Sequence, residues 1–470
     1  MFVPTMRSSA RFVASLFMIM AAVSVAGTAP QKAATAVDTK ALASQVRAEF
    51  QHAWNGYTRS AWGHDELNPI SKTSRDLTEG LIVYATAVEA LDTMYLMGMK
   101  AEADQAKAYV LDHLSFDHDV SVSTVEMTTK ILGSLLAVYQ ITGDPKVLTK
   151  AEDLGTRLLP AFDSPSGMPY RVVNLKTRQT RDASVGAADV GTLLLELGTL
   201  AALTKKPLFY AKAKTAVVEL YNRRSKVTGL VGQRIDVEHG TWVGPPATHL
   251  GRGIDSYYEY LLKCEKLFGD ADCADMWRNS IATINKYLAD DRPNGLWYGT
   301  ADMTTGRKAE PAYDSLQGSF PALLAMSGDL PRARRLQDSA FTFWTLNSLP
   351  PDVADYATMR VLNPPYYLRA EMVESVYYLS HYTKDPKYLE MGRTMFNDVV
   401  KYCRTDEGYT IVDNVMTKQK GDRMPSALFA ETFKYFYLLF SPRALDFDKV
   451  VFTTKGHPLQ RVAPLPASHR

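Results

Sequence analysis

The chain has 470 residues, of which 53 are lysine or arginine and 51 are aspartate or glutamate. This near balance, with no long basic run, argues against a nucleic-acid partner. Aromatic residues make up 10% of the chain, and the 25 tyrosines outnumber the 18 phenylalanines, a composition compatible with a polar cleft for sugars.

The first residues have the pattern of an export signal. Residues 1–26 contain Arg7 and Arg11, no acidic residue, and the apolar run FVASLFMIMAAVSVA (12–26), which closes on the small residues Ser24 and Ala26. We predict a signal peptide over residues 1–26, a linker over 27–45, and an exported protein, periplasmic or secreted, without a stable membrane anchor. An uncleaved anchor is the alternative, but a spanning helix needs about 20 apolar residues.

Most of the remaining chain predicts helices that come in pairs. The stretch EMTTKILGSLLAVYQIT (126–142) places Ile131, Leu135 and Tyr139 on one face at helical spacing. Short turns recur between apolar helices, with helix stop and start signals at each. They lie near Gly98, Gly143, Lys205, Gly269, Gly328, Lys384 and Ser441, at successive offsets of 45, 62, 64, 59, 56 and 57 residues. A period near 60 corresponds to two helices and two loops, repeated seven times.

The other set of loops is long and varied, as over residues 163–189 and 295–320, and β-like segments such as GLWYGT (295–300) lie near turns. We therefore predict an all-α fold, a closed (α/α)7 barrel over residues 46–462 whose long loops build a site at one mouth, followed by a tail over 463–470. An open helical solenoid is the alternative, although its repeats would be shorter and more uniform.

Near its end the chain has an unusual apolar run, KVVFTTKGHPLQ (449–460). Two threonines lie at the tip of this β-branched run, and a turn with His457 and Pro458 follows. A surface tail rarely needs such a sequence. We predict a short β-like segment with buried hydroxyl groups.

Several carboxylates interrupt helix faces that should be apolar. Taken singly, each could be a helix N-cap or a buried salt-bridge partner. Acids from several hairpins of one ring would, however, point toward a common axis, and burying them without purpose is costly. They are Asp92, Glu126, Asp255, Glu371, Glu374 and Glu431.

Eight segments resemble the motifs of a known family, in order from about residue 50 to 460. They are HAWNGYTRSAWGHDEL, ALDTMYLMG, STVEMTTKILGSLLAVYQITGD, KAEDLGTRLLPAFDSPSGMPY, GRGIDSYYEYLLK, LRAEMVESVYYL, LFAETFKYFYLLF and VFTTKGHPL. The chain thereby resembles glycoside hydrolase family forty-seven, the class I α-1,2-mannosidases. The resemblance implies an (α/α)7 barrel, a C-terminal β-like plug that closes one end of it, hydrolysis with inversion, and a Ca²⁺ ion at the barrel floor.

For the metal, the resemblance implies that Thr454 binds Ca²⁺ through its hydroxyl and its backbone carbonyl. Calcium takes 6–8 oxygen ligands, and the remaining positions would go to water and to two mannose hydroxyls. The alternative is that Thr453, or a plain tail, occupies this place.

For catalysis, an inverting glycosidase needs an acid for the leaving oxygen and a base for the attacking water. By resemblance Glu126 is the acid, acting through a water, Glu371 is the base, and Asp255 is a third catalytic carboxylate. The resemblance also implies positive charge near the acid and the base, and carboxylates that hold the sugar and the metal's waters. These residues are Lys130 and Arg369, and then Asp92, Asp189, Glu374 and Glu431.

The chain also departs from the family pattern. Lys455 follows Thr454 where a glutamate is usual, so one water-holding carboxylate is missing. Ser315 follows Asp314 where many members have histidine, Ala427 replaces a frequent phenylalanine, and Gly318 offers no cysteine for the eukaryotic-type disulfide. We expect an active, minimal member with altered metal affinity and altered contacts on the leaving-group side.

Three cysteines leave two possibilities open. Cys264 and Cys273 could bridge a helical hairpin in an oxidising compartment, or remain unpaired thiols beside Cys403. We expect a monomer acting on an α-1,2-linked mannoside. Two other readings are another inverting α/α-barrel glycosidase with a different sugar, and a glycan-binding relative without turnover.

Overall fold

The computed structural model describes Met1 and residues 37–462. The predicted signal peptide beyond Met1, residues 27–36 of the predicted linker and the tail 463–470 lie outside the described residues. Helix α1 (Thr39–Ser60) begins earlier than the sequence indicated, because the Asp38 side chain accepts the N–H of Ala41 at 2.9 Å. The predicted linker over 27–45 is therefore too long at its C-terminal end.

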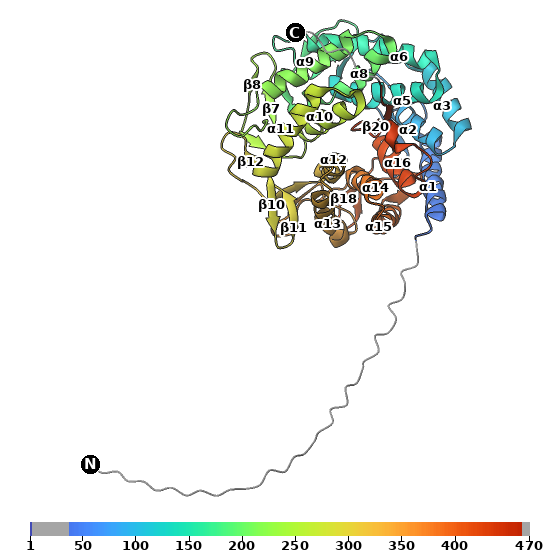
Figure 1. The fold of residues 1–470 in the computed structure, drawn as a ribbon. Helices are drawn as coiled ribbons and strands as arrows, with labels where there is room; N and C mark the ends of the chain where they lie inside the picture. Colours follow the sequence, from blue (N-terminus) through green and yellow to red (C-terminus); the bar gives the residue numbers. More distant parts are fainter. Residues whose placement is uncertain (2–36, 463–470) are drawn as a thin grey trace, which may run out of the picture. The chain divides into compact units, whose positions relative to one another are not determined.

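Within residues 37–462 the helices form a closed ring of two layers, an inner and an outer one (Figure 1). The outer layer consists of α1, α3 (Lys100–His113), α6 (Pro145–Leu158), α9 (Leu208–Asn222), α11 (Ala271–Tyr287), α13 (Leu330–Asn347) and α15 (Lys387–Cys403). Each outer helix packs on an inner helix beside it in the sequence, and α1 closes the ring by packing on the last inner helix, α16 (Phe433–Phe440).

Seven inner segments line the axis, and several are interrupted by short 3₁₀ or π-helical turns. In chain order they are α2 (Ala85–Leu96); α4 (Thr124–Glu126), η1 (Met127–Leu132) and α5 (Gly133–Thr142); α7 (Ala187–Gly191) and α8 (Leu194–Thr204); α10 (Asp255–Phe268); η3 (Ser315–Ser319) and α12 (Phe320–Met326); α14 (Glu371–Thr383); and η4 (Leu428–Thr432) with α16. The predicted (α/α)7 barrel is thus confirmed.

The inner helices are buried on nearly every side, because the outer helices pack on one side of them and the neighbouring inner segments on the others. In α2 every residue from Ala85 to Met94 is buried. Among the described residues, one segment, Ala187–Thr204, is long and apolar enough to cross a membrane, and 78% of it is buried inside the protein. Its apolar character follows from its place in the inner layer.

Six of the predicted short turns connect an inner helix to the next outer one, and the seventh, at Ser441, leads from α16 toward the C-terminal end of the chain. Six of them contain a residue with positive φ, which lets the last turn of the inner helix close before the chain reverses. In four this residue is glycine, and in two it is a lysine, Lys205 at φ 59° and Lys384 at φ 55°. The seventh turn, at Ser441, has φ −129° and no such residue.

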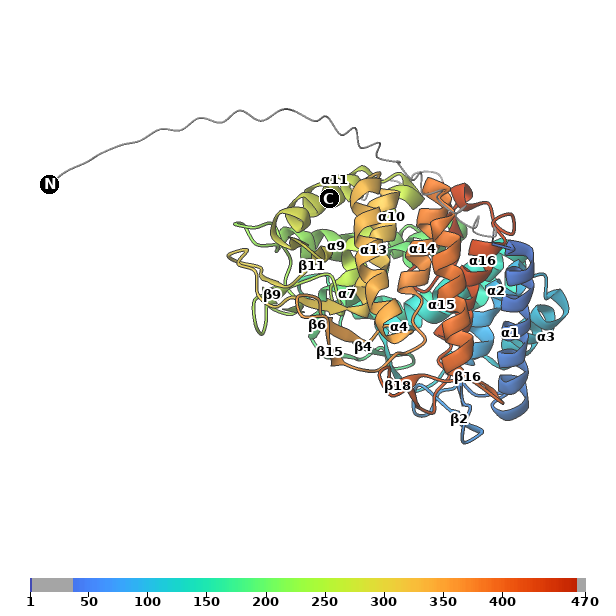
Figure 2. The ribbon, with the colours of Figure 1, turned by 90° about the horizontal axis from the view of Figure 1, so that it is seen from below.

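The long loops lie at the opposite end and contain short antiparallel strands (Figure 2). Three three-stranded sheets tie neighbouring loops together: β3 (Ser121–Ser123), β4 (Val172–Asn174) and β5 (Thr180–Arg181); β6 (Ser184–Gly186), β7 (Arg234–Asp236) and β8 (Thr241–Trp242); and β13 (Ala312–Asp314), β14 (Val353–Asp355) and β15 (Arg360–Asn363). In each sheet the first strand leads directly into an inner helix. The rim therefore fixes where these helices begin.

Two-stranded pairs complete the rim. They are β1 (Glu66–Asn68) with β2 (Thr73–Arg75), β9 (Ala247–Thr248) with β12 (Ala301–Asp302), β10 (Ala289–Arg292) with β11 (Gly295–Tyr298), β16 (Arg404–Thr405) with β17 (Gly408–Tyr409), and β18 (Val412–Asn414) with β19 (Gln419–Lys420). Two further 3₁₀ turns are η2 (Leu159–Phe162) and η5 (Phe447–Lys449).

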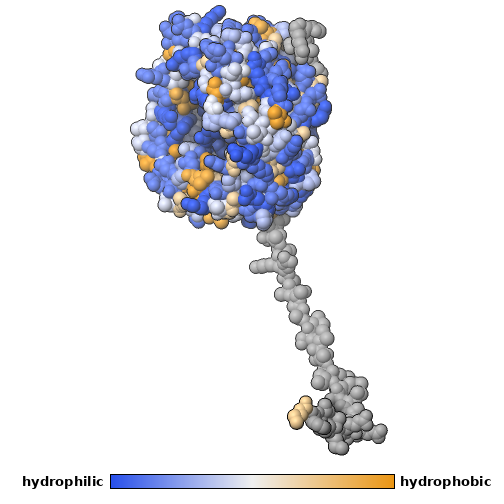
Figure 3. Space-filling model, turned by 90° about the vertical axis from the view of Figure 1, so that its left-hand side faces the viewer, coloured by the Kyte–Doolittle hydropathy of each residue, from blue (hydrophilic) through white to orange (hydrophobic). Residues whose placement is uncertain are grey.

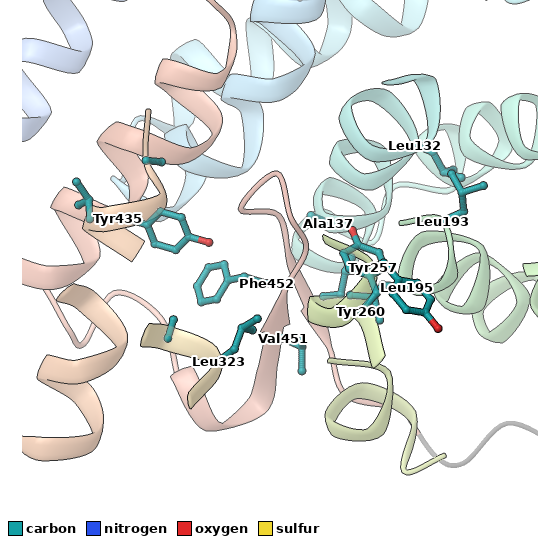
Figure 4. Close-up of a cluster of buried hydrophobic side chains, with 14 of the residues drawn as sticks. Leu132, Ala137, Leu193, Leu195, Tyr257, Tyr260, Leu323, Tyr435, Val451 and Phe452 are labelled. Carbon is teal, nitrogen blue, oxygen red and sulfur yellow. The ribbon is translucent and has the colours of Figure 1, made fainter. Parts of the chain in front are cut away.

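The last hairpin, β20 (Val450–Phe452) with β21 (Pro458–Gln460), enters the ring. It follows the C-terminal end of α16, so it enters from the end opposite the rim strands. Figure 4 shows Val451 and Phe452 among side chains of surrounding inner helices, including Tyr260, Leu323 and Tyr435. All five are buried. The hairpin is the predicted β-like plug.

Cys264 and Cys273 form a disulfide that joins the end of α10 to the start of α11, and Cys403 is free and buried. Of the two possibilities left open by the sequence, the structure has the bridge. On the outside, the face in Figure 3 is largely hydrophilic, with scattered apolar side chains.

The short turns offer a test of backbone conformation alone. A Cβ added at Gly143 meets no atom within 4 Å, and Gly143 has φ +68°. Gly143→Ala should therefore lower the free energy of unfolding by about 1 kcal/mol, the cost of a left-handed non-glycine residue. Lys205→Gly should change it in the opposite direction by a smaller amount. Scanning calorimetry of both variants checks this, and shifts of the same sign would contradict it.

Candidate active site

Three predicted catalytic carboxylates lie in the first turns of inner segments, at the end of the ring where the rim strands lie. Glu126 is in the first turn of α4, Asp255 begins α10 and Glu371 begins α14. A helix N-terminus favours a negative charge. The charge of Glu371 also contributes to the pKa shift of Asp255. The charges of Glu371 and Glu126 both act on Lys455. The three carboxylates therefore lie near one another at the mouth of the ring, in a region called here the chamber.

Glu126 is an ion-paired carboxylate. Its Oε2 lies 3.0 Å from Nζ of Lys130, one turn later on the π-helical segment η1, and its side chain is 54% exposed to the chamber. Burial raises the pKa of Glu126, but the charges of Lys130 and Lys455 outweigh burial and hold it below its ordinary value. Glu126 is therefore ionised at neutral pH.

Asp255 has the opposite environment. Burial, together with the charges of Glu259, Asp314 and Glu371, raises the pKa of Asp255 to about 7. No lysine or arginine forms an ion pair with it within the described part of the chain. Asp255 consequently binds a proton far more readily than Glu126.

Glu371 has one engaged and one free oxygen. Arg369 places Nη1 3.7 Å from its Oε1, while Oε2 is buried without a hydrogen-bond partner among the described residues. Gly318 packs directly behind, because a Cβ there would lie 3.0 Å from N of Met372 and 3.4 Å from Cβ of Glu371. Since the space is this tight, a cysteine at position 318 would displace the start of α14.

Asp352 positions Arg369 and was not found by sequence reasoning. Its carboxylate is 1% exposed and accepts hydrogen bonds from Arg369, Arg252, Asn363 and Ser315. Ser315 also donates its backbone N–H to the Asp352 carbonyl at 2.8 Å. Ser315, which stands where many family members have histidine, thus belongs to the hydrogen-bond network that holds Arg369.

Glu374 lies one turn deeper and belongs to a second buried network. Lys263 donates to Oε1 of Glu259 at 2.5 Å and to Oε1 of Glu374 at 3.3 Å. Burial raises the pKa of Glu374 to about 7, although Lys263 acts against it. Glu259 and Lys263 lie within the motif DSYYEYLLK, and their spacing of four residues on one helix face could have revealed the pair.

The tip of the plug hairpin carries the two threonines. The hydroxyl of Thr453 accepts the N–H groups of Lys455 at 3.3 Å and His457 at 3.2 Å, so this side chain holds the turn together. Thr454 donates its N–H to the Tyr260 hydroxyl at 3.2 Å, and its own hydroxyl has no hydrogen-bond partner among the described residues. Of the two, Thr454 is therefore the threonine with an oxygen free for a ligand.

Two predicted substrate-binding acids have other partners. Asp92 is fully buried, and its Oδ2 accepts from Nζ of Lys434 at 2.8 Å and lies 2.9 Å from Nδ1 of His457. Lys434 also donates to the carbonyl of Gly456 at 2.6 Å, so this cluster anchors the plug. Asp189 accepts the N–H of Gly186 at 2.9 Å and caps α7.

The axis also carries acidic groups that sequence reasoning missed. Both carboxylate oxygens of Glu89 and Oε2 of Glu196 are buried without a hydrogen-bond partner among the described residues. Burial raises the pKa of Glu196 to about 8, and that of Glu431, which Lys455 faces, to about 8 as well. Buried polar atoms without partners are rare in proteins, so these groups indicate a site that takes up polar ligands.

A ring of helical hairpins with paired acids at its mouth is the architecture of an α/α-barrel glycosidase. The sequence profile of glycosyl hydrolase family 47 matches residues 49–461, and the chain belongs to this family.

Similar proteins agree with this assignment. An α-mannosidase I of Arabidopsis thaliana is 33% identical over 91% of this chain and 78% of its own length. An endoplasmic reticulum mannosyl-oligosaccharide 1,2-α-mannosidase of Mus musculus is 34% identical, over 88% of this chain and 67% of its own. The solved α-1,2-mannosidase of Trichoderma reesei superposes with a TM-score of 0.83 and 25% identity, covering 90% of this chain and 99% of that one.

The anchor of the plug can be tested at Asp92. Burial raises the pKa of Asp92, but Lys434 and His457 outweigh it and hold the pKa below 3.8. The ionised carboxylate therefore contributes stability that is present above its ordinary pKa and lost as the pH falls through the lowered value. Asp92→Asn should cost about 3–5 kcal/mol at pH 7, because it leaves a buried lysine unpaired.

Urea unfolding at pH 7 measures this loss, and Asp275→Asn, which breaks an exposed pair with Arg278, is the matched control at about 0–1 kcal/mol. Equal losses in the two variants would show that Asp92 does not anchor the plug.

Proposed function

We propose that the protein is a calcium-dependent, inverting α-mannosidase that releases terminal mannose from α-1,2-linked mannosides. The observation that carries the proposal is the arrangement of Glu126, Asp255 and Glu371 around one chamber, each in the first turn of its own inner segment. The printed names of the relatives, which are α-1,2-mannosidases, supply the substrate class.

Glu371 is the proposed base. Its unpartnered Oε2 can accept a proton from a water that attacks the anomeric carbon on the face opposite the leaving oxygen. Arg369, held by Asp352, keeps positive charge beside the other oxygen. One water is consumed, the glycosidic bond breaks, and the product is the β-anomer of mannose.

The acid role divides between two carboxylates. The resemblance gives it to Glu126, acting through a water. The charges around the chamber favour Asp255 as the store of the proton, because its pKa of about 7 keeps it largely protonated at slightly acidic pH. Glu126, paired with Lys130, would then orient the water or the sugar as an anion. We therefore propose that Asp255 supplies the proton and that Glu126 acts as an anion, in place of the assignment of Glu126 as the acid.

The residues at the tip of the plug fit a calcium ion. Thr454 offers a free hydroxyl oxygen, and the orphaned oxygens of Glu89 and Glu371 can hold waters. Within residues 37–462, two clusters bring three aspartate, glutamate, histidine or cysteine ligand atoms close together. Neither cluster lies at the chamber. An ion here would therefore be held by Thr454 and by waters. When bound, it would grip two ring hydroxyls and help distort the sugar toward the transition state.

We further propose that the protein is exported and monomeric. The Cys264–Cys273 disulfide supports an oxidising compartment. The largely hydrophilic face in Figure 3 supports a protein without a large partner on that side.

The stereochemistry of the product tests the function. With α-1,2-mannobiose the β-anomer of mannose should appear first by NMR, because an inverting enzyme delivers water opposite the leaving group. The α-anomer appearing first would exclude inversion. Cleavage of another disaccharide instead would favour a different sugar, and binding without any turnover would favour a glycan-binding relative.

The two candidate acids can be separated by leaving group. If Asp255 supplies the proton, Asp255→Asn should lower kcat about 10²–10⁴-fold for mannobiose but much less for an aryl mannoside, whose phenolate leaves with little protonation. Glu126→Gln should then lower kcat similarly for both substrates, and Glu371→Gln severely for both.

The pH profile adds a second measurement. With Asp255 as the acid, kcat for mannobiose should fall as the pH rises through about 7, where this carboxyl loses its proton. Leaving-group dependence in Glu126→Gln, with a uniform effect in Asp255→Asn, would return the acid role to Glu126.

A further inference from the structure

Lys455 places a cation beside the proposed metal ligand. Its Nζ lies 3.9 Å from Oε1 of Glu431, and its side chain is 29% exposed to the chamber. Its charge also acts on Glu126 and Glu371. The ammonium therefore faces three carboxylates from three different inner segments, while its backbone directly follows Thr454.

The position of Lys455 is fixed by the turn that carries it. Its backbone N–H is held by the Thr453 hydroxyl, and the preceding Thr454 is held by Tyr260. Gly456 follows with φ +68°, and a Cβ there would lie 3.0 Å from the carbonyl of Ala430 and 3.3 Å from Cγ of Glu431. The hairpin tip thus lies directly against the segment with Glu431.

An ammonium and a metal ion at this tip would draw on the same negative charge. Adjacent residues have Cα atoms 3.8 Å apart, so an ion on Thr454 would lie within a few ångströms of the Lys455 stem. The ammonium lies at the far end of that stem, and two positive charges that share the carboxylates of one site repel each other. A carboxylate that already faces an ammonium also attracts a second cation less strongly.

We propose that Lys455 competes with calcium as a tethered cation: its ammonium balances the negative charge of the carboxylates around the hairpin tip when the ion is absent, and weakens the ion's binding to Thr454. The inference rests on the calcium site of the proposed function, but it concerns a different residue. According to this proposal, the charge of Lys455 determines how tightly the protein binds Ca²⁺.

Isothermal titration calorimetry of the whole exported chain with CaCl₂ tests the inference without any measurement of activity. Lys455→Gln should lower the Kd for Ca²⁺ at least tenfold relative to the wild type, and Lys455→Glu should lower it further. Lys455→Arg keeps the charge and should retain the weak binding of the wild type. Lys449→Gln, at an exposed lysine of the segment that leads into the same hairpin, should leave the Kd unchanged.

Thr454→Ala separates the two proposals. If it abolishes calcium binding while Lys455→Gln and Lys455→Glu bind as weakly as the wild type, the calcium site stands and the role of Lys455 is wrong. If calcium binds equally well without the Thr454 hydroxyl, or binds to none of the variants, the site at Thr454 itself is wrong. The rise in melting temperature with CaCl₂ should rank the variants in the same order, since an ion that binds only the folded state stabilises it.

Discussion

The structure depends on one constraint, that a carboxylate at the axis of an apolar ring must have a partner. An unpaired buried charge costs several kcal/mol, because the charge has lost its contact with water. The protein meets this constraint in different ways along the axis. Asp92 is paired with Lys434 and His457, Glu374 with Lys263, and Glu126 with Lys130. Both oxygens of Glu89 and one oxygen of Glu371 lack such partners among the described residues.

The rim strands fix where the inner segments begin, and so where the acids of their first turns lie. Because the outer helices end at the rim, every inner segment begins there, and its first turn points its N–H groups toward the mouth. The strands β3, β6 and β13 each pair with a hairpin of the following loop before an inner segment starts. The first turn that carries Glu126, which follows β3, is thus held by two neighbouring loops rather than by one. Local irregularity adds to this, since π-helical turns lie beside Glu126 and contain Glu431, and such turns are frequent at functional sites.

Much of the ring could be read from the sequence because its signals are local. The turns at Gly143, Lys205 and Lys384 are marked by helix stop and start residues, and in the structure all three of these residues have a left-handed backbone. The partners of the acids could not be read in the same way. Asp92 is 342 residues from Lys434, and Asp352 is recognisable only once Arg252 and Arg369 converge on it. The start of α1 was missed because Asp38 is a cap without an apolar run before it.

The plug has a consequence for how the protein is made. Residues 450–460 carry the turn with Thr454 and also the hydrophobic contacts of Val451 and Phe452 at the centre of the ring. Because α1 packs on α16, the first outer helix likewise reaches its place in the ring only after the last inner helix has been synthesised. A growing chain therefore cannot assemble a working chamber until almost all of it has been synthesised. Translation products that stop short of the hairpin would lack the turn with Thr454 and the side chains of Val451 and Phe452 at the centre of the ring, so we expect them to be inactive.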